Sequence, residues 1–374
     1  MKIAKADALM WFRFFAELDE DEGLGPRQME IAYSVLSQIE TAQEKRLDAL
    51  KKQIPGLKSL QGRTLYVGPE ALFPRGCTGC LLGTGLSAVR RTHVCNANCP
   101  FCYDYGVLDE QMPVGEGFFE IGGCRYRPED LPLLLDSYAK PSGVAYVYLE
   151  PFMEIEVYEP VIRAFHERGV YQHMYTNGTL CTPQNLRMLA EAGLDELRFN
   201  LGASMCADRV IENMATASRL LPAVGIETPM TPELYETFMQ KKDRILSTGI
   251  RFMNCAELHL NENNLPNYLG ENLYMTRLGY LSPTFSREGT LRLMATADRE
   301  GWPICVHDCS NMTKFARDLA QKAKEGGWFG QSSWQMEFDR IPFEAFLPIL
   351  EDESFQFLEE EPLPVGFRPG DIVI

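Results

Sequence analysis

The sequence lacks any apolar run long enough to cross a bilayer. Its first residues, Met1 to Lys5, lead into acidic and aromatic residues rather than into the hydrophobic stretch and cleavage site of a signal peptide. Positive charge is also scarce, because 36 Lys and Arg face 52 Asp and Glu and leave a formal net charge of -16. An acidic surface repels phosphate backbones. We therefore expect a cytoplasmic protein without membrane association, and nucleic acid is disfavoured as a partner.

Internal repeats and low-complexity linkers are absent as well, so the 374 residues are expected to form one compact unit. Three parts are distinguished within it. Residues 1–74 are expected to form a helical N-terminal extension, with two amphipathic helices between Ala6 and Lys52. Residues 75–326 carry a regular alternation of strands and helices. Residues 327–374 are aromatic, rich in proline and acidic, and we expect them to form an irregular C-terminal cover.

Cysteine, by contrast, is plentiful, with 11 residues in the chain. Without an export signal, this number favours a reducing compartment and metal ligation over a disulfide framework. Cys95, Cys99 and Cys102 stand in one short loop with the spacing CxxxCxxC. Three thiols cannot pair off as disulfides, but they can bind three irons of a 4Fe-4S cube and leave the fourth iron open. The alternatives are a zinc site whose fourth ligand comes from elsewhere, or buried free cysteines.

This spacing, together with Phe101 just before the last cysteine, resembles the cluster loop of the radical S-adenosylmethionine (radical SAM) superfamily. The resemblance implies that Cys95, Cys99 and Cys102 hold a 4Fe-4S cluster whose open iron is chelated by S-adenosylmethionine, with Phe101 at the cofactor. It further implies that an electron from the cluster cleaves S-adenosylmethionine to a 5′-deoxyadenosyl radical, which abstracts hydrogen from a small-molecule or peptide substrate. A reducing partner such as flavodoxin or ferredoxin would supply the electron. The alternatives are a glycyl-radical-enzyme activating enzyme and a non-catalytic zinc or iron–sulfur protein.

Short β-rich segments alternate with helical stretches from about Ala145 onward, which is typical of βαβ units and a parallel sheet. The expected strands are Ser87 to Val94, Ala145 to Leu149, Tyr171 to Tyr175, Glu196 to Leu201, Gly225 to Thr228, Met253 to Leu260 and Pro303 to His307. The expected helices are Val157 to Arg168, Pro183 to Ala192, Met205 to Leu221, Pro232 to Ser247, Arg287 to Glu300 and Thr313 to Glu325. This α/β order resembles the partial (β/α)6 TIM-like barrel of radical SAM enzymes, with the active site at the carboxyl ends of the strands.

Two of these expected strands end in candidate cofactor ligands. Glu150 and Pro151 occupy the position of the family's GGEP motif, which implies that they take the amino group of S-adenosylmethionine, although Tyr148 and Leu149 replace both glycines. A helix-entry Glu-Pro without a ligand is the alternative. The pair Thr176 and Asn177 resembles the "TNG" strand end that reaches the carboxylate side of the cofactor, and a plain Asn-Gly turn is the alternative.

Polar residues also stand among apolar ones at later strand ends. Asn200 is a candidate for the ribose of the cofactor. Glu257, His259 and Asn261 alternate onto one face of their expected strand, and Glu257 and Asn261 are assigned to cofactor binding. A buried Glu or His is costly unless it is hydrogen-bonded or functional. Satisfied structural hydrogen bonds would explain these residues equally well.

A second group of soft ligands flanks the expected barrel. Cys77 and Cys80 form a CxxC upstream of the cluster loop, and Cys305, His307 and Cys309 lie in a CxHxC segment at the last strand. Some uncharacterised radical SAM proteins similar to glycyl-radical-enzyme activators carry comparable segments, and the resemblance implies a second metal, either zinc or an auxiliary iron–sulfur cluster. Unliganded buried cysteines are the alternative. The remaining cysteines, Cys124, Cys181, Cys206 and Cys255, are assigned to packing.

Overall fold

The computed structural model describes residues 43–313, except positions 63, 83–85, 92, 109–113, 122–123, 138–142, 262, 269, 276–280 and 312. Of the expected N-terminal helices, only the end is described, where residues 43–51 are helical. The expected helix after Thr313 and the C-terminal cover over 327–374 lie outside the described residues. None of the helices in the described part is both long and apolar enough to span a membrane.

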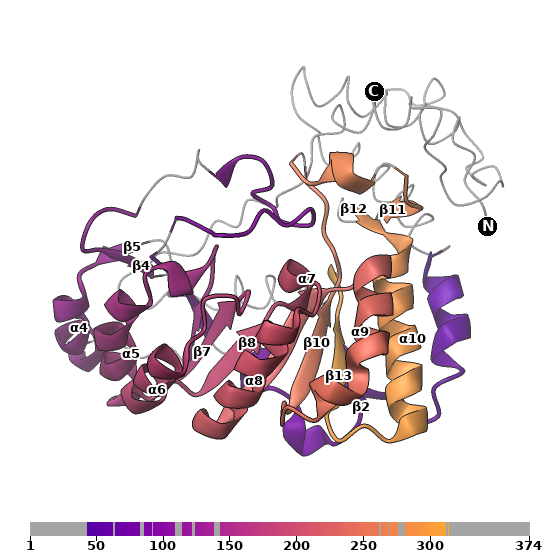
Figure 1. Cartoon of the computed structure of the whole chain (residues 1–374), viewed down its shortest axis with the longest axis horizontal. Helices are drawn as coiled ribbons and strands as arrows, with labels where there is room; N and C mark the ends of the chain where they lie inside the picture. The colour runs from indigo at the N-terminus through magenta and orange to yellow at the C-terminus, as the bar shows by residue number, and fades with distance from the viewer. Residues whose placement is uncertain are drawn as a thin grey trace, which may run out of the picture.

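A mixed sheet of mostly parallel strands forms the centre of the molecule (Figure 1). Its parallel part consists of neighbours that follow one another in chain order. These strands are β3 (Leu86–Arg90), β6 (Gly143–Tyr146), β7 (Tyr171–Thr176), β8 (Glu196–Phe199), β9 (Ala223–Pro229), β10 (Phe252–Ala256) and β13 (Cys305–Cys309). Since each neighbour is the next parallel strand along the chain, their carboxyl ends share one edge of the sheet.

Antiparallel strands extend this sheet on both sides. β2 (Thr64–Val67) and β1 (Lys58–Leu60) continue it beyond β13, and β4 (Phe119–Ile121) and β5 (Cys124–Tyr126) continue it beyond β3. The two end strands that the structure describes, β1 and β5, do not pair with each other, so the sheet is not closed into a barrel. A separate two-stranded sheet pairs β11 (Leu273–Met275) with β12 (Leu281–Pro283). The expected α/β class with a large parallel sheet is therefore confirmed, whereas the expected partial (β/α)6 TIM-like barrel is not.

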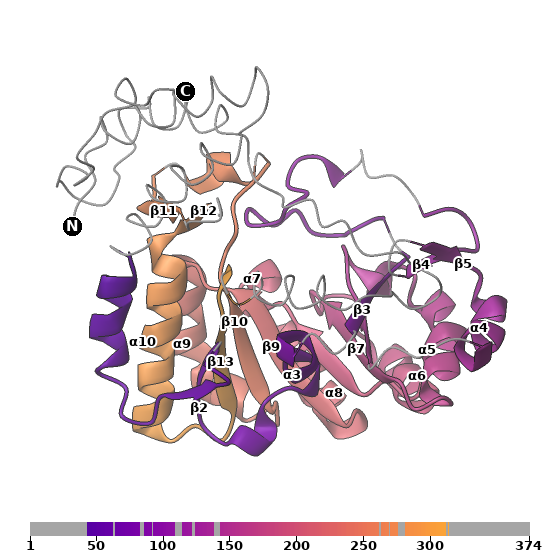
Figure 2. The same cartoon turned by 180° about the vertical axis from the view of Figure 1, so that it is seen from behind.

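The connecting helices cover one face of the sheet, and α3 lies on the other (Figures 1 and 2). The helices are α3 (Arg75–Leu82), α4 (Leu131–Ser137), α5 (Glu159–His166), α6 (Pro183–Ala192), α7 (Leu201–Ser204), α8 (Asp208–Leu220), α9 (Pro232–Leu246) and α10 (Thr284–Glu300). Short 3-10 turns are η1 (Glu70–Leu72), η3 (Pro128–Asp130), η4 (Pro151–Met153), η5 (Ile155–Tyr158) and η6 (Leu265–Tyr268). The face that carries α3 is the one toward which Arg198 and His173 project, because both side chains approach Gly76 of that helix.

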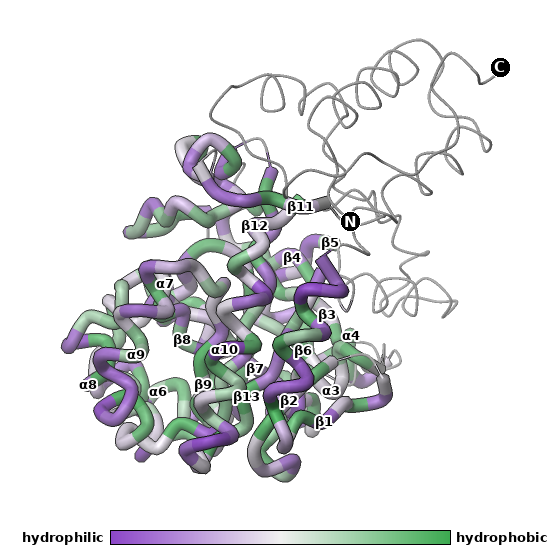
Figure 3. The backbone as a smooth tube through the Cα atoms, turned by 90° about the vertical axis from the view of Figure 1, so that its right-hand side faces the viewer, coloured by the Kyte–Doolittle hydropathy of each residue, from purple (hydrophilic) through white to green (hydrophobic). Residues whose placement is uncertain are grey.

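Local signals explain where the most regular helices begin and end. Thr182 accepts a hydrogen bond from Asn185 N and forms a capping box, Pro183 occupies the first turn, and Gly193 ends α6 with a φ of 93°. The predicted helix Pro183 to Ala192 is thus confirmed with the same bounds. Thr231 caps α9 in the same way through Leu234 N. Apolar residues of these helices pack on the sheet, and Figure 3 shows hydrophobic segments at strands such as β6 and β9.

Several strands end earlier than predicted, as β3, β6 and β8 do, and the early end of β10 changes the site. The sequence predicts a strand over Met253 to Leu260, but β10 ends at Ala256, where its pairing with Cys309 of β13 ends. Beyond this point Leu260 makes only an isolated bridge to Leu281. The prediction that Glu257, His259 and Asn261 alternate along one strand is therefore wrong, since all three lie after the strand.

Candidate active site

A pocket of about 890 Å³ opens at the carboxyl ends of the parallel strands. This is where right-handed crossovers gather the loops of a parallel sheet. The residues that line it are Cys95, Ala97, Cys99, Phe101, Cys102, Tyr103, Asp104, Tyr148, Leu149, Glu150, Tyr175, Thr176, Asn177, Asn200, Ala203, Glu227, Thr228, Pro229, Ala256, Glu257, Leu258, His259, Asn261 and Asn263. The structure thus brings the three loop cysteines and all cofactor-binding candidates to one pocket, except Pro151, which is buried at the start of η4.

The cysteine loop leaves its three thiols partly buried at the pocket. A turn in which Cys102 N donates to Cys99 O, at 2.8 Å, sets the last two side by side. Burial raises the pKa of Cys99 to about 12, and the charges that Cys102 and Cys95 would carry as thiolates add to the shift. Without a cation beside it Cys99 therefore stays a neutral thiol, and a bound metal would be needed to hold it as a thiolate.

A single ion and a cluster differ in what they require of the three loop thiols. Among the described residues, no group of three His, Cys, Asp or Glu side chains converges closely enough to hold a metal ion, and this includes the loop cysteines. A 4Fe-4S cube does not require such convergence, because each thiolate binds a different iron at a different corner. Three thiols at one pocket are the number of protein ligands that a cube with one open iron would take.

Glu150 stands at the end of β6 with its carboxylate buried in the pocket wall. Oε1 accepts hydrogen bonds from Thr176 Oγ1 at 2.8 Å and from Phe152 N at 3.1 Å, and Oε2 accepts one from Asn177 N at 2.6 Å. Burial raises the pKa of Glu150, while these three donors lower it. A carboxylate has about four lone-pair sites. One site on Oε2 thus stays available for a further donor.

The two residues before Glu150 adopt a backbone conformation that favours glycine. Tyr148 has a φ of 85° and Leu149 a φ of 51°. A positive φ costs a side-chain-bearing residue about 1–3 kcal/mol. The backbone of this segment therefore adopts the positive φ values that glycine favours, although neither residue is glycine. Replacing the two glycines of the GGEP motif by Tyr148 and Leu149 thus changes the side chains at these positions rather than the course of the backbone.

The end of β7 is tied both to Glu150 and to the cysteine loop. Thr176 and Asn177 donate to Glu150, and Asn177 Nδ2 also donates to Asn96 Oδ1 at 2.7 Å. Asn177 Oδ1 accepts from the backbone N and the hydroxyl of Thr179, which fixes the turn that follows. The Asn-Gly turn thus has a structural role in addition to facing the pocket.

Asn200 and Phe101 meet around the short helix α7. Asn200 Oδ1 caps this helix through Ala203 N at 3.3 Å and accepts from Thr228 Oγ1 at 2.9 Å. The Phe101 ring lies against Gly202, where an added Cβ would stand 3.0 Å from Cε1 of the ring. A side chain at this position would crowd both the ring and Thr228 Oγ1, which an added Cβ would approach to 2.8 Å, so the glycine lets the ring of the cysteine loop lie against the end of β8.

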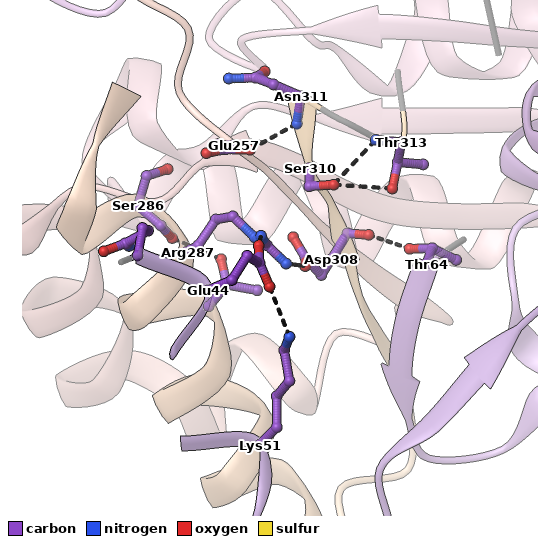
Figure 4. Close-up of polar contacts among 12 residues, drawn as sticks. Glu44, Lys51, Thr64, Glu257, Ser286, Arg287, Asp308, Ser310, Asn311 and Thr313 are labelled. Carbon is purple, nitrogen blue, oxygen red and sulfur yellow. Dashed lines mark hydrogen bonds and ion pairs between the residues drawn. The ribbon is translucent and has the colours of Figure 1, made fainter. Parts of the chain in front are cut away.

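Glu257 is buried just beyond β10, between the pocket and the last strand. Oε2 accepts a hydrogen bond from Asn311 N at 2.6 Å, and Oε1 accepts one from the Tyr274 hydroxyl. Figure 4 shows Glu257 pointing at Asn311 in the turn after β13. Burial raises the pKa of Glu257, and Arg287 lowers it in part. These contacts favour the structural reading that the sequence left open for this residue.

His259 and Asn261 contact the cysteine loop rather than one another. The Tyr103 hydroxyl bonds His259 Nδ1, and the two rings meet edge to face with centroids 5.2 Å apart. Asn261 Nδ2 donates to the backbone carbonyl of Tyr103 at 3.0 Å. Both residues therefore line the pocket from the segment after β10.

The predicted second metal site receives no support from the structure, because its residues, all within the described part of the chain, do not converge closely enough to hold a metal ion. Its CxxC lies on α3, where Cys77 Sγ accepts a hydrogen bond from Arg198 Nη1 at 3.3 Å. Arg198 is itself buried and pairs with Glu196 at 2.5 Å and with Glu227 at 2.5 Å. Burial raises the pKa of Cys77 and the arginine lowers it. The positive charge in this part of the interior is thus supplied by a guanidinium.

The last strand limits which residues could share an ion. Cys305, His307 and Cys309 alternate along β13, but residues four apart in a strand are separated by about 13 Å, so Cys305 and Cys309 cannot bind one ion and only His307 could accompany Cys309. His307 packs on the Phe73 ring with centroids 4.7 Å apart. Burial and Arg198 together lower the pKa of His307 to about 3.

Several pocket residues were not identified from the sequence. Tyr103 and Asp104 follow Cys102 directly, and this adjacency was the available signal. Tyr175 and Glu227 lie on β7 and β9. A hydroxyl-bearing or charged residue near the end of an apolar strand could have identified them as pocket residues. Burial raises the pKa of Asp104, to which the Tyr148 hydroxyl donates at 3.5 Å.

Comparison with protein families finds one match within the chain. Residues 89–204, which span the cysteine loop and the strands through β8, match the radical SAM superfamily. Two curated relatives are similar over longer stretches. A proposed glycyl-radical enzyme activating enzyme of Methanocaldococcus jannaschii is 26% identical over 212 residues, which cover 51% of this chain and 52% of that protein. The tungsten-containing aldehyde ferredoxin oxidoreductase cofactor-modifying protein of Pyrococcus furiosus is 25% identical over 189 residues, covering 45% and 49%.

The chain thus spans about half the length of the curated relatives it matches. Among solved structures, Streptococcus suis SuiB bound to S-adenosylmethionine is similar with a TM-score of 0.42 and 12% identity, covering 60% of this chain and 50% of that one. SuiB bound to the precursor peptide SuiA gives a TM-score of 0.34 and 15% identity, covering 46% and 39%.

Proposed function

The chain carries a radical SAM superfamily domain over residues 89–204, and from this premise we propose that its pocket binds a 4Fe-4S cluster and S-adenosylmethionine side by side. Cys95, Cys99 and Cys102 would hold the cluster. The observation that carries the proposal is that these three thiols share one pocket with Glu150 and Asn177 at the carboxyl ends of the parallel strands. When bound, the cluster supplies the electron for reductive cleavage of S-adenosylmethionine to a 5′-deoxyadenosyl radical.

The chain's own residues bind and orient the cofactor in this proposal. Glu150 offers its remaining lone pair on Oε2 to the cofactor's ammonium group, while its other bonds hold Thr176 and Asn177 in place. Asn200, held by Thr228, is assigned to the ribose. Phe101, fixed against Gly202, excludes water on the cluster side. Glu257 is assigned a structural role because its carboxylate joins Tyr274 of β11 to the turn after β13 at Asn311.

The substrate is proposed to be a small molecule or a peptide, with flavodoxin or ferredoxin as electron donor in the cytoplasm. Activation of a glycyl-radical enzyme is the second candidate, and the similarity to the Methanocaldococcus jannaschii relative favours it. We interpret the open parallel sheet as the counterpart of the partial barrel of this family. A second metal is not part of the proposal, since Arg198 occupies that part of the interior.

Anaerobic reconstitution with iron and sulfide tests the proposal. We expect about four irons per chain and a paramagnetic resonance signal that shifts when S-adenosylmethionine is added, because only an open iron can take the cofactor. Cys95→Ala, Cys99→Ala and Cys102→Ala should each lose the signal and the formation of 5′-deoxyadenosine. Cys124→Ala, in β5 and outside the pocket lining, is the matched control and should load normally.

Three results would contradict this function. Retention of 5′-deoxyadenosine formation by any loop variant would remove that cysteine from the ligand set. Bound zinc without sulfide, or a cluster whose signal ignores S-adenosylmethionine, would favour a non-catalytic metal protein.

A further inference from the structure

Side-chain amides from the segment after β10 donate to backbone carbonyls of the cysteine loop, about 160 residues earlier in the chain. Figures 1 and 2 show this segment rising from β10 beside the loop. Asn263 Nδ2 donates to Tyr103 O at 2.7 Å, and Asn267 Nδ2 donates to Pro100 O at 2.9 Å. Asn261 and Asn264 contribute two more such bonds, to Tyr103 O at 3.0 Å and to Phe101 O at 3.2 Å. We call these four residues the asparagine clamp.

The clamp residues lie on a turn that is held by hydrogen bonds among its own residues. Asn261 Oδ1 accepts from the backbone amides of Asn263 and Asn264, both at 3.2 Å, and Asn264 Oδ1 accepts from Asn261 N at 2.8 Å. Asn264 Nδ2 also donates to His259 O at 3.2 Å. Asn261 and Asn264 therefore shape their own segment in addition to bonding the cysteine loop, whereas the bonds given for the side chains of Asn263 and Asn267 go to the loop.

We propose that the asparagine clamp is a positioning device that holds the cysteine loop in its metal-binding conformation before any metal arrives. The proposal rests on the proposed cluster-binding function of that loop. The carbonyls that receive the bonds belong to Pro100, Phe101 and Tyr103, so they lie between and directly after Cys99 and Cys102. Fixing this stretch of backbone fixes the direction in which both thiols leave it, and a preorganised loop loses less entropy on binding.

The chemistry of asparagine suits this position. An amide donates to carbonyls without a net charge, so the clamp adds no full charge beside a cluster that thiolates would bind. A lysine could make the same contacts, but its positive charge would stabilise the reduced cluster. The clamp therefore separates positioning of the loop from tuning of its potential.

Hydrogen exchange of the metal-free protein tests the proposal without depending on cluster chemistry. In the double variant Asn263→Ala, Asn267→Ala we expect the amides of residues 99–107 to exchange roughly tenfold faster, because two net hydrogen bonds to the loop are lost. Asn213→Ala is the matched control. Asn213 is also partly buried and donates from α8 to the carbonyl of Gly178 at 2.9 Å, outside the cysteine loop. It should leave exchange of residues 99–107 unchanged.

The reconstituted protein provides a second readout. The double variant should release iron to a chelator roughly tenfold faster and should give a broader paramagnetic resonance signal, since its loop samples more conformations. The control variant should match the wild type in both. Cooperative melting of each variant establishes that the fold is intact. If the double variant melts without cooperativity, the same measurements on the single variants Asn263→Ala and Asn267→Ala decide the point.

Unchanged exchange at residues 99–107 in a folded double variant would overturn the clamp, even if the wild-type protein binds its cluster. Faster exchange in the control variant to the same extent would overturn it too, because the effect would then not be specific to the loop. If the wild-type protein binds no cluster while exchange responds as expected, the proposed function fails and the positioning of the loop stands as a property of the metal-free chain.

Discussion

The carboxylate of Glu150 accepts a hydrogen bond of 2.6 Å from the backbone amide of Asn177, 27 residues later in the chain. This bond joins the carboxyl ends of β6 and β7, and Asn177 in turn bonds Asn96 of the cysteine loop. One buried carboxylate therefore links two strand ends, and through Asn177 it reaches the loop. A residue that the resemblance assigns only to the cofactor also organises the site that would receive it.

Glu150→Gln is accordingly expected to destabilise the metal-free protein as well as to weaken cofactor binding. Glutamine retains one acceptor for Thr176 and Phe152, but its NH2 group would face the amide of Asn177, so a buried donor loses its partner. We expect a loss of about 1–3 kcal/mol in the free energy of unfolding, measured by denaturant titration.

Glu154→Gln is the control for this prediction. Glu154 lies four residues later and contacts Arg91 at 3.7 Å with a partly exposed carboxylate. It should change the free energy of unfolding little. Equal stability of Glu150→Gln and the wild type would show that the contacts of Glu150 do not hold the strand ends together.

The order of the elements was predictable from the sequence because its signals are local. A Thr-Pro pair starts α6 and α9, and a glycine with positive φ ends α6. Parallel strands that follow chain order then bring the strand ends to one edge, so the cysteine loop, Glu150 and Asn177 were expected to meet.

Long-range contacts decided what the sequence could not show. The alternation after Ala256 reads like a continuing strand, yet the pairing with β13 ends there and the chain turns toward the cysteine loop. The spacing of Cys305 and Cys309 suggested shared ligation, but spacing along a strand also sets their separation. Nothing in the apolar stretch around Arg198 predicted that its side chain would donate a hydrogen bond to Cys77.

The backbone at Leu149 leads to a prediction of unusual sign. At a φ of 51°, glycine avoids the steric cost that alanine bears, so Leu149→Gly should be more stable than Leu149→Ala by about 1 kcal/mol. Leu149→Val should be the least stable of the three, because a β-branched residue tolerates positive φ poorly. Free energies of unfolding of the three variants decide the order.

The control uses Leu133, which is exposed within α4. There the helix reverses the order, and Leu133→Ala should be more stable than Leu133→Gly by about 1 kcal/mol. If Leu149→Ala were also more stable than Leu149→Gly, the positive φ assigned to position 149 would be contradicted.

Arg198 leads to a prediction about buried charge. Its side chain is 2% exposed and lies between Glu196 and Glu227. Arg198→Met would leave two carboxylates without their cation, and we expect a loss of about 3–5 kcal/mol in the free energy of unfolding. Adding Glu196→Gln should restore part of this loss, since one uncompensated charge is then removed.

Arg244→Met is the matched surface control for Arg198. Arg244 also pairs with two carboxylates, Asp208 at 2.9 Å and Glu212 at 3.0 Å, but its side chain is 44% exposed. Solvent screens these pairs, so the variant should lose far less stability. Equal losses at the two sites would show that burial of Arg198 carries no energetic consequence.

Glu44 gives the chain a predicted pH dependence. It lies in the helix over 43–51 and pairs with Arg287 at 2.5 Å, while Arg287 also bonds Asp308 at 2.9 Å (Figure 4). Burial alone would raise the pKa of Glu44, but Arg287 and Lys51 outweigh it and lower the pKa below its ordinary value of 4.5. On acidification the unfolded chain therefore takes up the proton first, and the pair stabilises the folded protein fully above that value.

Glu44→Gln should thus lower the free energy of unfolding near pH 7 by about 1 kcal/mol, a figure reduced for the partial exposure of the carboxylate. The difference from the wild type should shrink as the pH falls below 4.5 and through the lower folded pKa, because wild-type Glu44 is then neutral as well. Asp48→Asn, which removes a more exposed partner of Lys51, should change stability little at either pH. Unfolding measured in denaturant from pH 7 to pH 3 decides the point: a difference that stays constant or grows on acidification would mean that the Glu44–Arg287 pair does not hold this helix against α10.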